Sequence, residues 1–105
     1  MKTWYCLQLG NGGQAMGPCN QIQETFLALS AHQGHRLDLA VFYKHDPASR
    51  EITAYFSPGA HQLALHFDAI PCARPEPEGL EILAGDDRCW DLVFGGDQPN
   101  PKQPE

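Results

Sequence analysis

Basic residues are scarce in this chain of 105 residues, and none of them cluster. Seven Lys and Arg stand against 13 Asp and Glu, which gives a formal net charge of −6 with neutral histidines. Because Lys and Arg contacts to phosphates supply most of the affinity for nucleic acid, we expect no DNA or RNA partner. Anionic membrane surfaces attract the same basic clusters, so we also expect no membrane partner.

Long apolar runs are missing as well. No stretch approaches the roughly 18 consecutive apolar residues that a membrane-spanning helix needs. The first residues, MKTWYC, have neither the apolar segment nor the small-residue cleavage site of an export signal. The sequence therefore predicts a soluble protein of the cytoplasm.

The four cysteines lack the short C-x₂₋₄-C spacing that makes a zinc motif specific. In the cytoplasm, cysteines are expected as free thiols, buried small side chains or ligands, and disulfides are the alternative. Cys6 and Cys89 fall in predicted strands, and we interpret them as buried apolar residues. Cys19 and Cys72 fall in predicted loops and are the candidates for chemistry.

Apolar residues make up 42 % of the chain, and all of them lie within the first 94 residues. This content is enough for one hydrophobic core, so residues 1–94 are predicted to form a single domain. Residues 95–105 are polar and contain three prolines. A segment without apolar side chains cannot bury enough surface to order itself, so we expect a disordered polar tail.

The first third of the chain predicts a strand followed by a helix. Residues 4–9 are aromatic and branched and run into a glycine-rich turn, which is typical of a strand. Asn20 is a good N-cap for apolar residues that recur with helical spacing, and Gly34 is typical of a helix end. A helix is therefore expected between these two residues.

A hairpin and a second helix are predicted next. Residues 37–44 and 52–56 alternate in side-chain character on either side of a turn over residues 45–50. Ser57, followed by a proline, is typical of a helix start. The apolar residues as far as Phe67 fit helical spacing, and an alternating strand over the same segment stays open.

The last predicted elements form a second hairpin, with strands over residues 80–83 and 89–94 joined through Gly85 and two aspartates. The resulting order β-α-β-β-α-β-β predicts an α+β fold. We expect a two-layer sandwich with two helices on one face of a mainly antiparallel sheet. Its first part matches the β-α-β-β-α-β connection of ferredoxin-like folds, so we predict a ferredoxin-like variant.

This topology brings three segments to one rim of the sheet: the start of the first helix, the 45–50 turn and the segment from His66 to Cys72. A helix N-terminus favours a thiolate, which makes Cys19 the best reactive thiol and Cys72 its candidate resolving partner. The candidate catalytic residues are Cys19, His45, Asp46 and Arg50, with His45 as general base and Arg50 as anion clamp.

Two candidate ligand sites accompany this rim. Two cysteines and two histidines provide the donors of a tetrahedral zinc site, and the set is Cys19, His45, His66 and Cys72. The glycine-rich turn has backbone amides that suit a small anion, and it consists of Gly10, Asn11, Gly12 and Gly13. It does not open directly into a helix, as a dinucleotide-binding fingerprint would. The alternative is that all these residues are ordinary loop residues.

Adjacent aromatic residues occur in each of the first three predicted strands: Trp4–Tyr5, Phe42–Tyr43 and Tyr55–Phe56. Neighbouring strand residues point to opposite faces, so both faces of the sheet are predicted to be apolar. Two helices cover one face, and a second copy of the chain is the simplest cover for the other. The alternative is that the C-terminal hairpin or the proline-rich crossing covers it.

Together these patterns predict a non-catalytic binding or regulatory module that forms a homodimer. The alternative is a small enzyme, or a thiol-redox or metal-binding protein, that uses the Cys- and His-bearing rim. We expect no cofactor for the first hypothesis, and zinc is the metal of the second.

Overall fold

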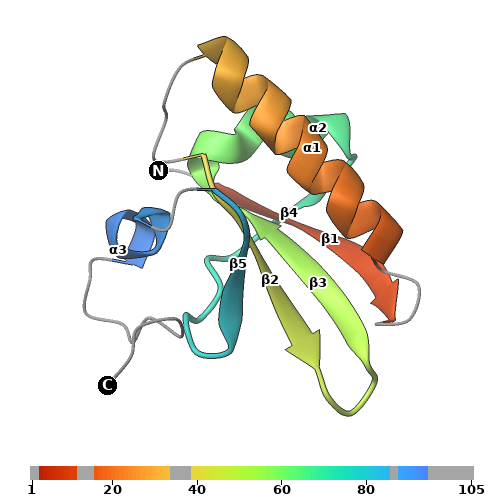
Figure 1. Ribbon diagram of the computed structural model, residues 1–105. Coiled ribbons are helices and arrows are strands. Elements are labelled where there is room, and N and C mark those ends of the chain that lie inside the picture. Colours follow the sequence, from red (N-terminus) through yellow and green to blue (C-terminus); the bar gives the residue numbers. More distant parts are fainter. Residues whose placement is uncertain (1–2, 12–15, 34–38, 86–87, 95–105) are drawn as a thin grey trace.

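The computed structural model describes residues 3–11, 16–33, 39–85 and 88–94, and it has an α+β fold (Figure 1). Five strands form one antiparallel sheet in the order β4-β1-β3-β2-β5. None of the helices in these ranges is long and apolar enough to cross a membrane. The elements are β1 (Trp4–Asn11), α1 (Met16–Gln33), β2 (Val41–Asp46), β3 (Glu51–Phe56), the 3₁₀ turn η1 (Pro58–Ala60), α2 (His61–His66), β4 (Ile70–Cys72), β5 (Leu80–Ala84) and α3 (Cys89–Phe94).

The predicted hairpin is confirmed, with strands whose ends differ from the prediction. β2 and β3 pair from Val41 opposite Phe56 to Asp46 opposite Glu51, so the turn has four residues. Arg50 closes this turn with a left-handed φ of 63°, and its backbone N–H donates to the carbonyl oxygen of Asp46. The alternation of side chains therefore located the strands, and the turn geometry set their ends.

The first strand is confirmed and continues into the predicted glycine turn. β1 reaches Asn11, which pairs with Glu51 after an irregularity in register that begins at Gln8. Gly10 lies in this irregular stretch with a φ of 88°, a conformation that favours glycine. Gly12 and Gly13 lie outside the described residues, as does the predicted tail 95–105.

α1 and α2 lie against one face of the sheet and are confirmed as helices. α1 begins at Met16, so Asn20 lies inside the helix rather than at its cap. The segment that was open between helix and strand forms η1 and α2. Residues of both helices pack with inward side chains of the strands to form the core between the helices and the sheet. This core includes Ile22, Phe26, Leu63, Ala64, Leu9, Ala54 and Phe56.

The prediction of a second hairpin is wrong in its second half, because residues 89–94 form helix α3. Trp90 and Phe94 are four residues apart, which places both on one side of a helix. Both are buried against Trp4 and Phe42, on the sheet face opposite α1 and α2. Leu92, which fits a strand pattern, is 57 % exposed.

The second sheet face is thus covered where its aromatic residues lie. Ring centroids of Phe42 and Trp90 are 5.5 Å apart in an edge-on arrangement, and those of Trp4 and Phe94 are 6.0 Å apart. The C-terminal segment covers this face, as the alternative proposed, but as a helix rather than a hairpin. Burial of such large rings contributes several kcal/mol to folding.

The proline-rich crossing contains β4, a strand that the sequence did not predict. It pairs only three residues with β1, from Trp4 opposite Cys72 to Cys6 opposite Ile70. Pro71 is tolerated because β4 is at the edge of the sheet, where one side of the strand needs no partner.

Candidate functional site

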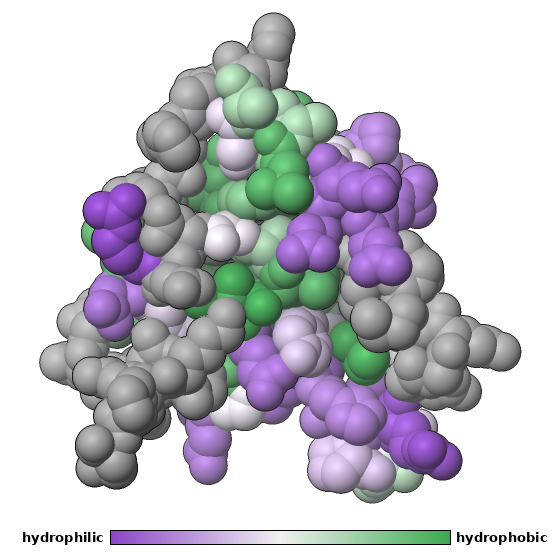
Figure 2. All heavy atoms as spheres, in the orientation of Figure 1, coloured by the Kyte–Doolittle hydropathy of each residue, from purple (hydrophilic) through white to green (hydrophobic). Residues whose placement is uncertain are grey.

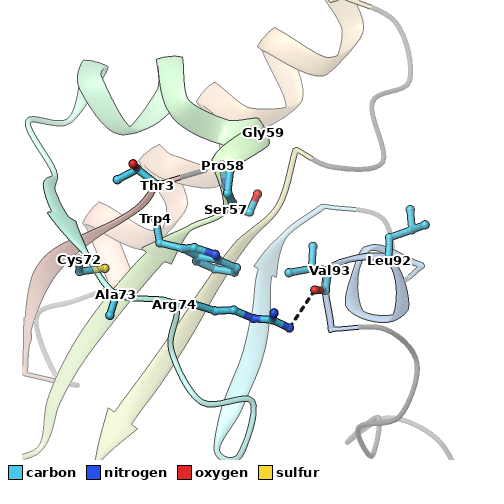
Figure 3. Close-up of a pocket in the computed structure, with 10 residues that line it drawn as sticks. All are labelled: Thr3, Trp4, Ser57, Pro58, Gly59, Cys72, Ala73, Arg74, Leu92 and Val93. Carbon is cyan, nitrogen blue, oxygen red and sulfur yellow. Dashed lines mark hydrogen bonds between the residues drawn. The ribbon is translucent and has the colours of Figure 1, made fainter. Parts of the chain in front are cut away.

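A pocket of about 770 Å³ lies at the end of the sheet where β1 begins and β4 ends (Figure 3). Four segments that are far apart in the sequence form its walls. They are the start of β1, the junction of β3 with η1, the end of β4 with the residues after it, and α3. The lining residues are Thr3, Trp4, Ser57, Pro58, Gly59, Cys72, Ala73, Arg74, Leu92 and Val93.

The indole of Trp4 is one of the apolar groups in the pocket wall. Trp4 is only 5 % exposed, because Phe42 and Phe94 pack against its ring. Side chains alternate between the two faces along β1. Trp4 therefore points toward α3, and its neighbour Tyr5 points toward the core under α1 and α2. The indole is therefore held rigidly among the aromatic rings under α3, and the small part of it that stays exposed gives the pocket an apolar contact.

Ser57 is buried beside this wall and is fixed by two hydrogen bonds to Ala40. Its Oγ accepts from the backbone N–H of Ala40 at 3.2 Å, and its own backbone N–H donates to the carbonyl oxygen of Ala40 at 3.0 Å. Its side chain makes no capping hydrogen bond to the helix that follows, although the sequence suggested that role. Ser57 therefore joins the end of β3 to the start of β2.

Arg74 contributes the charge of the pocket. Figure 3 shows its side chain extended toward α3, where Nη2 donates to the carbonyl oxygen of Val93 at 3.1 Å. The guanidinium carbon also lies 5.2 Å from the centroid of the Phe94 ring. None of the lining residues is Asp, Glu or His, so the pocket has one positive charge and no opposing carboxylate among its described residues. The local potential favours an anion.

The Cys72 thiol also faces this region, and its environment keeps it protonated. Burial, followed by a hydrogen bond with the Cys6 side chain and the charge of that group, raises the pKa of Cys72 to about 12. Burial and the charges of the same two cysteines raise the pKa of Tyr55. Because the thiolate is the nucleophile, Cys72 is a poor attacking group at neutral pH.

His45, Asp46 and Arg50, three of the predicted catalytic residues, lie together at the exposed β2–β3 turn. The Asp46 carboxylate accepts from the backbone N–H of Ala48 at 3.0 Å. This hydrogen bond, followed by one from the Ser49 side chain, lowers the pKa of Asp46. The Asp46 carboxylate thus stabilises the turn in which it lies, which is a common role for aspartate.

Cys72 does not join these residues at the predicted rim. It pairs with Trp4 at one end of β1, whereas His45 pairs with Ile52 near the other end. The strand rise places them roughly 15–20 Å apart along the sheet, and alternation puts them on opposite faces. The expected convergence was wrong because β4 runs back from the middle of β1 and ends where β1 begins.

The other predicted site residues are placed separately. His66 ends α2 and is exposed, with its ring 4.9 Å from the ring centroid of Phe67. Cys19 lies in the first turn of α1, and its side chain lies outside what the structure describes. Gly10 and Asn11 belong to β1, so half of the predicted anion loop is part of the sheet.

Among the described side chains, no group of three or more His, Cys, Asp and Glu is arranged to hold a metal ion. The predicted zinc set includes the undescribed Cys19 side chain and stays a prediction. Cys6, Cys72 and Cys89 form no disulfide in the structure; Cys89 is fully buried, as predicted, while Cys6 is half-buried.

Sequence reasoning missed the pocket because no local pattern marks it. The only signal is that Arg74 is the single cation between Arg50 and Arg88, in a segment rich in proline. Ser57 was selected as a helix cap and Trp4 as part of an apolar strand, and neither pattern identifies a binding site. Comparison of the chain with known protein families, with curated proteins and with solved structures finds no significant match.

Proposed function

We propose that this protein is a non-catalytic binding module whose pocket takes a small amphipathic anion. The observation that carries the proposal is the pairing of a buried indole, Trp4, with the Arg74 guanidinium in a pocket lined by no described carboxylate. In a chain with a net charge of −6, such a local excess of positive charge favours an anionic ligand.

The ligand is expected to have an apolar or aromatic body and one anionic group. A volume of about 770 Å³ falls within the ordinary range of small-molecule sites. The apolar body would lie on Trp4 and Val93. Arg74 uses one N–H on the Val93 carbonyl, and a guanidinium has five, so donors remain for a carboxylate, sulfonate or phosphate.

The chemistry of the lining supports binding rather than covalent catalysis. The raised pKa of Cys72 keeps that thiol protonated at neutral pH. The Ser57 oxygen already accepts from the backbone N–H of Ala40. No histidine is among the described lining residues to serve as a base beside either group.

A matched pair of dyes tests this proposal. 1-Anilinonaphthalene-8-sulfonate supplies an aromatic body with an anion, and N-phenyl-1-naphthylamine supplies a closely similar body without charge. We expect the sulfonate to bind in a 1:1 complex and to shift the NMR resonances of Trp4 and Val93. Arg74→Ala should lower the affinity for the sulfonate dye at least about tenfold, as expected for loss of a charged hydrogen bond. It should leave the affinity for the neutral dye unchanged.

Arg50→Ala is the control, because it removes one positive charge at the distant β2–β3 turn. It should leave the affinity of both dyes unchanged. The proposal is overturned if Arg74→Ala and Arg50→Ala weaken the sulfonate equally, if the shifts map away from the pocket, or if the anionic dye gives no saturable binding.

For the fold, we propose the ferredoxin-like arrangement for strands β1 to β4 with helices α1 and α2. The sequence order β1-α1-β2-β3-α2-β4 and the sheet order β4-β1-β3-β2 support it. β5 and α3 are then additions, one beside β2 and one over the second sheet face.

For the assembly, we propose a homodimer in the cytoplasm. Because α3 already covers the aromatic part of the second sheet face, that face gives no support for a partner. The support is that Figure 2 shows apolar residues gathered down the middle of one face, with hydrophilic residues to their right. Exposed large apolar side chains in the described ranges are Leu27, Leu65, Ile70 and Leu92. Analytical ultracentrifugation at high micromolar concentration should give twice the 11.6 kDa chain mass, and a monomer would overturn the dimer.

A further inference from the structure

Cys6 and Cys72 lie beside each other on adjacent strands of the sheet. Trp4 is directly opposite Cys72, and Cys6 is two residues further along β1. Residues two apart on a strand, and residues directly opposite, share a face, so both thiols point to the face that α3 covers. The Cys6 side chain is near enough to raise the pKa of Cys72, and both residues are half-buried free cysteines.

A small shift of β4 is enough to bring these thiols into bonding distance. Diagonal neighbours on paired strands have Cα atoms roughly 7–8 Å apart, and a disulfide needs about 4.4–6.8 Å. An approach of about 1 Å is therefore sufficient. β4 is a three-residue edge strand that pairs only with β1, and its first residue, Ile70, is 62 % exposed. In the described sheet, β4 is held by its three pairs with β1, and outside the sheet Cys72 packs against the aromatic cluster under α3.

We propose that Cys6 and Cys72 form a redox-active dithiol that oxidises to an intramolecular disulfide by exchange with a small disulfide such as oxidised glutathione. The product joins the edge strand β4 covalently to β1. The proposal does not depend on the ligand of the pocket or on the 45–50 turn.

The exchange proceeds in two steps. The Cys6 thiolate attacks one sulfur of oxidised glutathione, forms a mixed disulfide and releases one glutathione thiolate. Cys72 then loses its proton to solvent and attacks the Cys6 sulfur, which releases the second glutathione thiolate. The two cysteines lose two electrons and two protons, and one glutathione disulfide becomes two glutathione thiols.

The environment of Cys72 suits the resolving role. Burial and the neighbouring Cys6 hold its pKa high, so it does not make the first attack at neutral pH. Once Cys6 is in the mixed disulfide, its thiol no longer raises the pKa of Cys72, while burial, the largest cause, remains. The first step therefore removes part of what disfavours the second.

The experiment treats the reduced full-length chain with oxidised glutathione, quenches with acid and measures the intact mass. We expect a product two hydrogen atoms lighter than the reduced chain. Chymotryptic mapping of this wild-type product should join a peptide containing Cys6 to one containing Cys72. Cys19→Ser, the control substitution, should give the same product at the same rate.

The single variants test the order of attack. Cys72→Ser should stop at the mixed disulfide on Cys6, seen as a stable glutathione adduct. Cys6→Ser should form no intramolecular disulfide. The proposal is overturned if wild-type protein accumulates only glutathione adducts, if the mapped crosslink involves Cys19 or Cys89, or if Cys6→Ser still loses two hydrogens.

Discussion

The guanidinium of Arg74 donates a hydrogen bond from Nη2 to the carbonyl oxygen of Val93 over 3.1 Å. The carbonyl belongs to the last turn of α3, where a positive charge is favourable. The same side chain lies over the ring of Phe94. These contacts join the segment after β4 to α3, so one residue both closes a wall of the pocket and supplies its charge.

Replacement of Arg74 by alanine should destabilise the fold moderately. The variant loses the hydrogen bond to Val93 and the contact with Phe94. Because Arg74 is exposed, we expect a loss of only about 1 kcal/mol in the free energy of unfolding, measured by urea denaturation. Arg74→Lys, which keeps the charge, should lose less, and an Arg74→Ala protein as stable as wild type would contradict this account.

Gly85 approaches the backbone of the segment before β2 so closely that an added Cβ would be crowded. Its φ is 133°, and an added Cβ would lie 3.3 Å from the Leu39 carbonyl oxygen and 3.4 Å from the Cys89 Sγ. Gly85→Ala should therefore lower the free energy of unfolding by about 1–3 kcal/mol, because the backbone is both strained and crowded.

Gly79→Ala is the matched control for Gly85→Ala. Its φ of 83° is also positive, but the nearest atom to an added Cβ is the Lys44 Cε at 3.4 Å, in a flexible side chain that can move. Urea denaturation should show a smaller loss for Gly79→Ala than for Gly85→Ala. Equal losses in the free energy of unfolding would mean that the positive φ alone, and not the contact with Leu39, explains the destabilisation by Gly85→Ala.

Elements with strong local signals were predictable from the sequence, and α3 was not. Helical spacing identified α1, and alternation around a turn identified β2 and β3. In α3, Trp90, Leu92 and Phe94 fit a strand, and Trp90 with Phe94 also fits a helix. Packing of both rings on Phe42 decides between the two, and six residues of sequence do not contain that information.

The candidate site was less predictable, because its position depends on strand register. The element order placed Cys72 beside the 45–50 turn, but the pairing of Cys72 with Trp4 places it at the other end of the sheet. The same pairing brings Cys72 next to Cys6, which the sequence suggested only as a buried strand residue. Cys19 had been the expected partner of Cys72.

Trp90 combines a large buried ring with a polar atom that lacks a partner among the described residues. Its Nε1 is buried without a hydrogen bond, while the ring packs on Phe42 and Phe94. Trp90→Ala should cost about 3–5 kcal/mol through the cavity that it leaves. Trp90→Phe should cost about 1 kcal/mol or less, because it removes the unpaired N–H together with part of the ring. Urea denaturation of both variants checks this, and equal losses would refute the role assigned to the N–H group.

Asp46 should make the stability of the hairpin depend on pH in the acidic range. The backbone N–H of Ala48 lowers the pKa of its carboxyl in the folded state, so the contribution is present above the ordinary aspartate pKa of about 3.9. It is lost as the pH falls through the lowered folded value, because the unfolded chain takes up the proton first. Asp46→Asn keeps an oxygen acceptor for Ala48 but does not titrate. Its free energy of unfolding should therefore fall less steeply than that of wild type between pH 5 and pH 2. This pH window follows from the ordinary and the lowered pKa of the Asp46 carboxyl. Urea denaturation over this range, with Asp46→Ala as the variant that also loses the acceptor, measures the difference. Identical pH slopes for wild type and Asp46→Asn would show that other carboxyl groups govern the acid sensitivity.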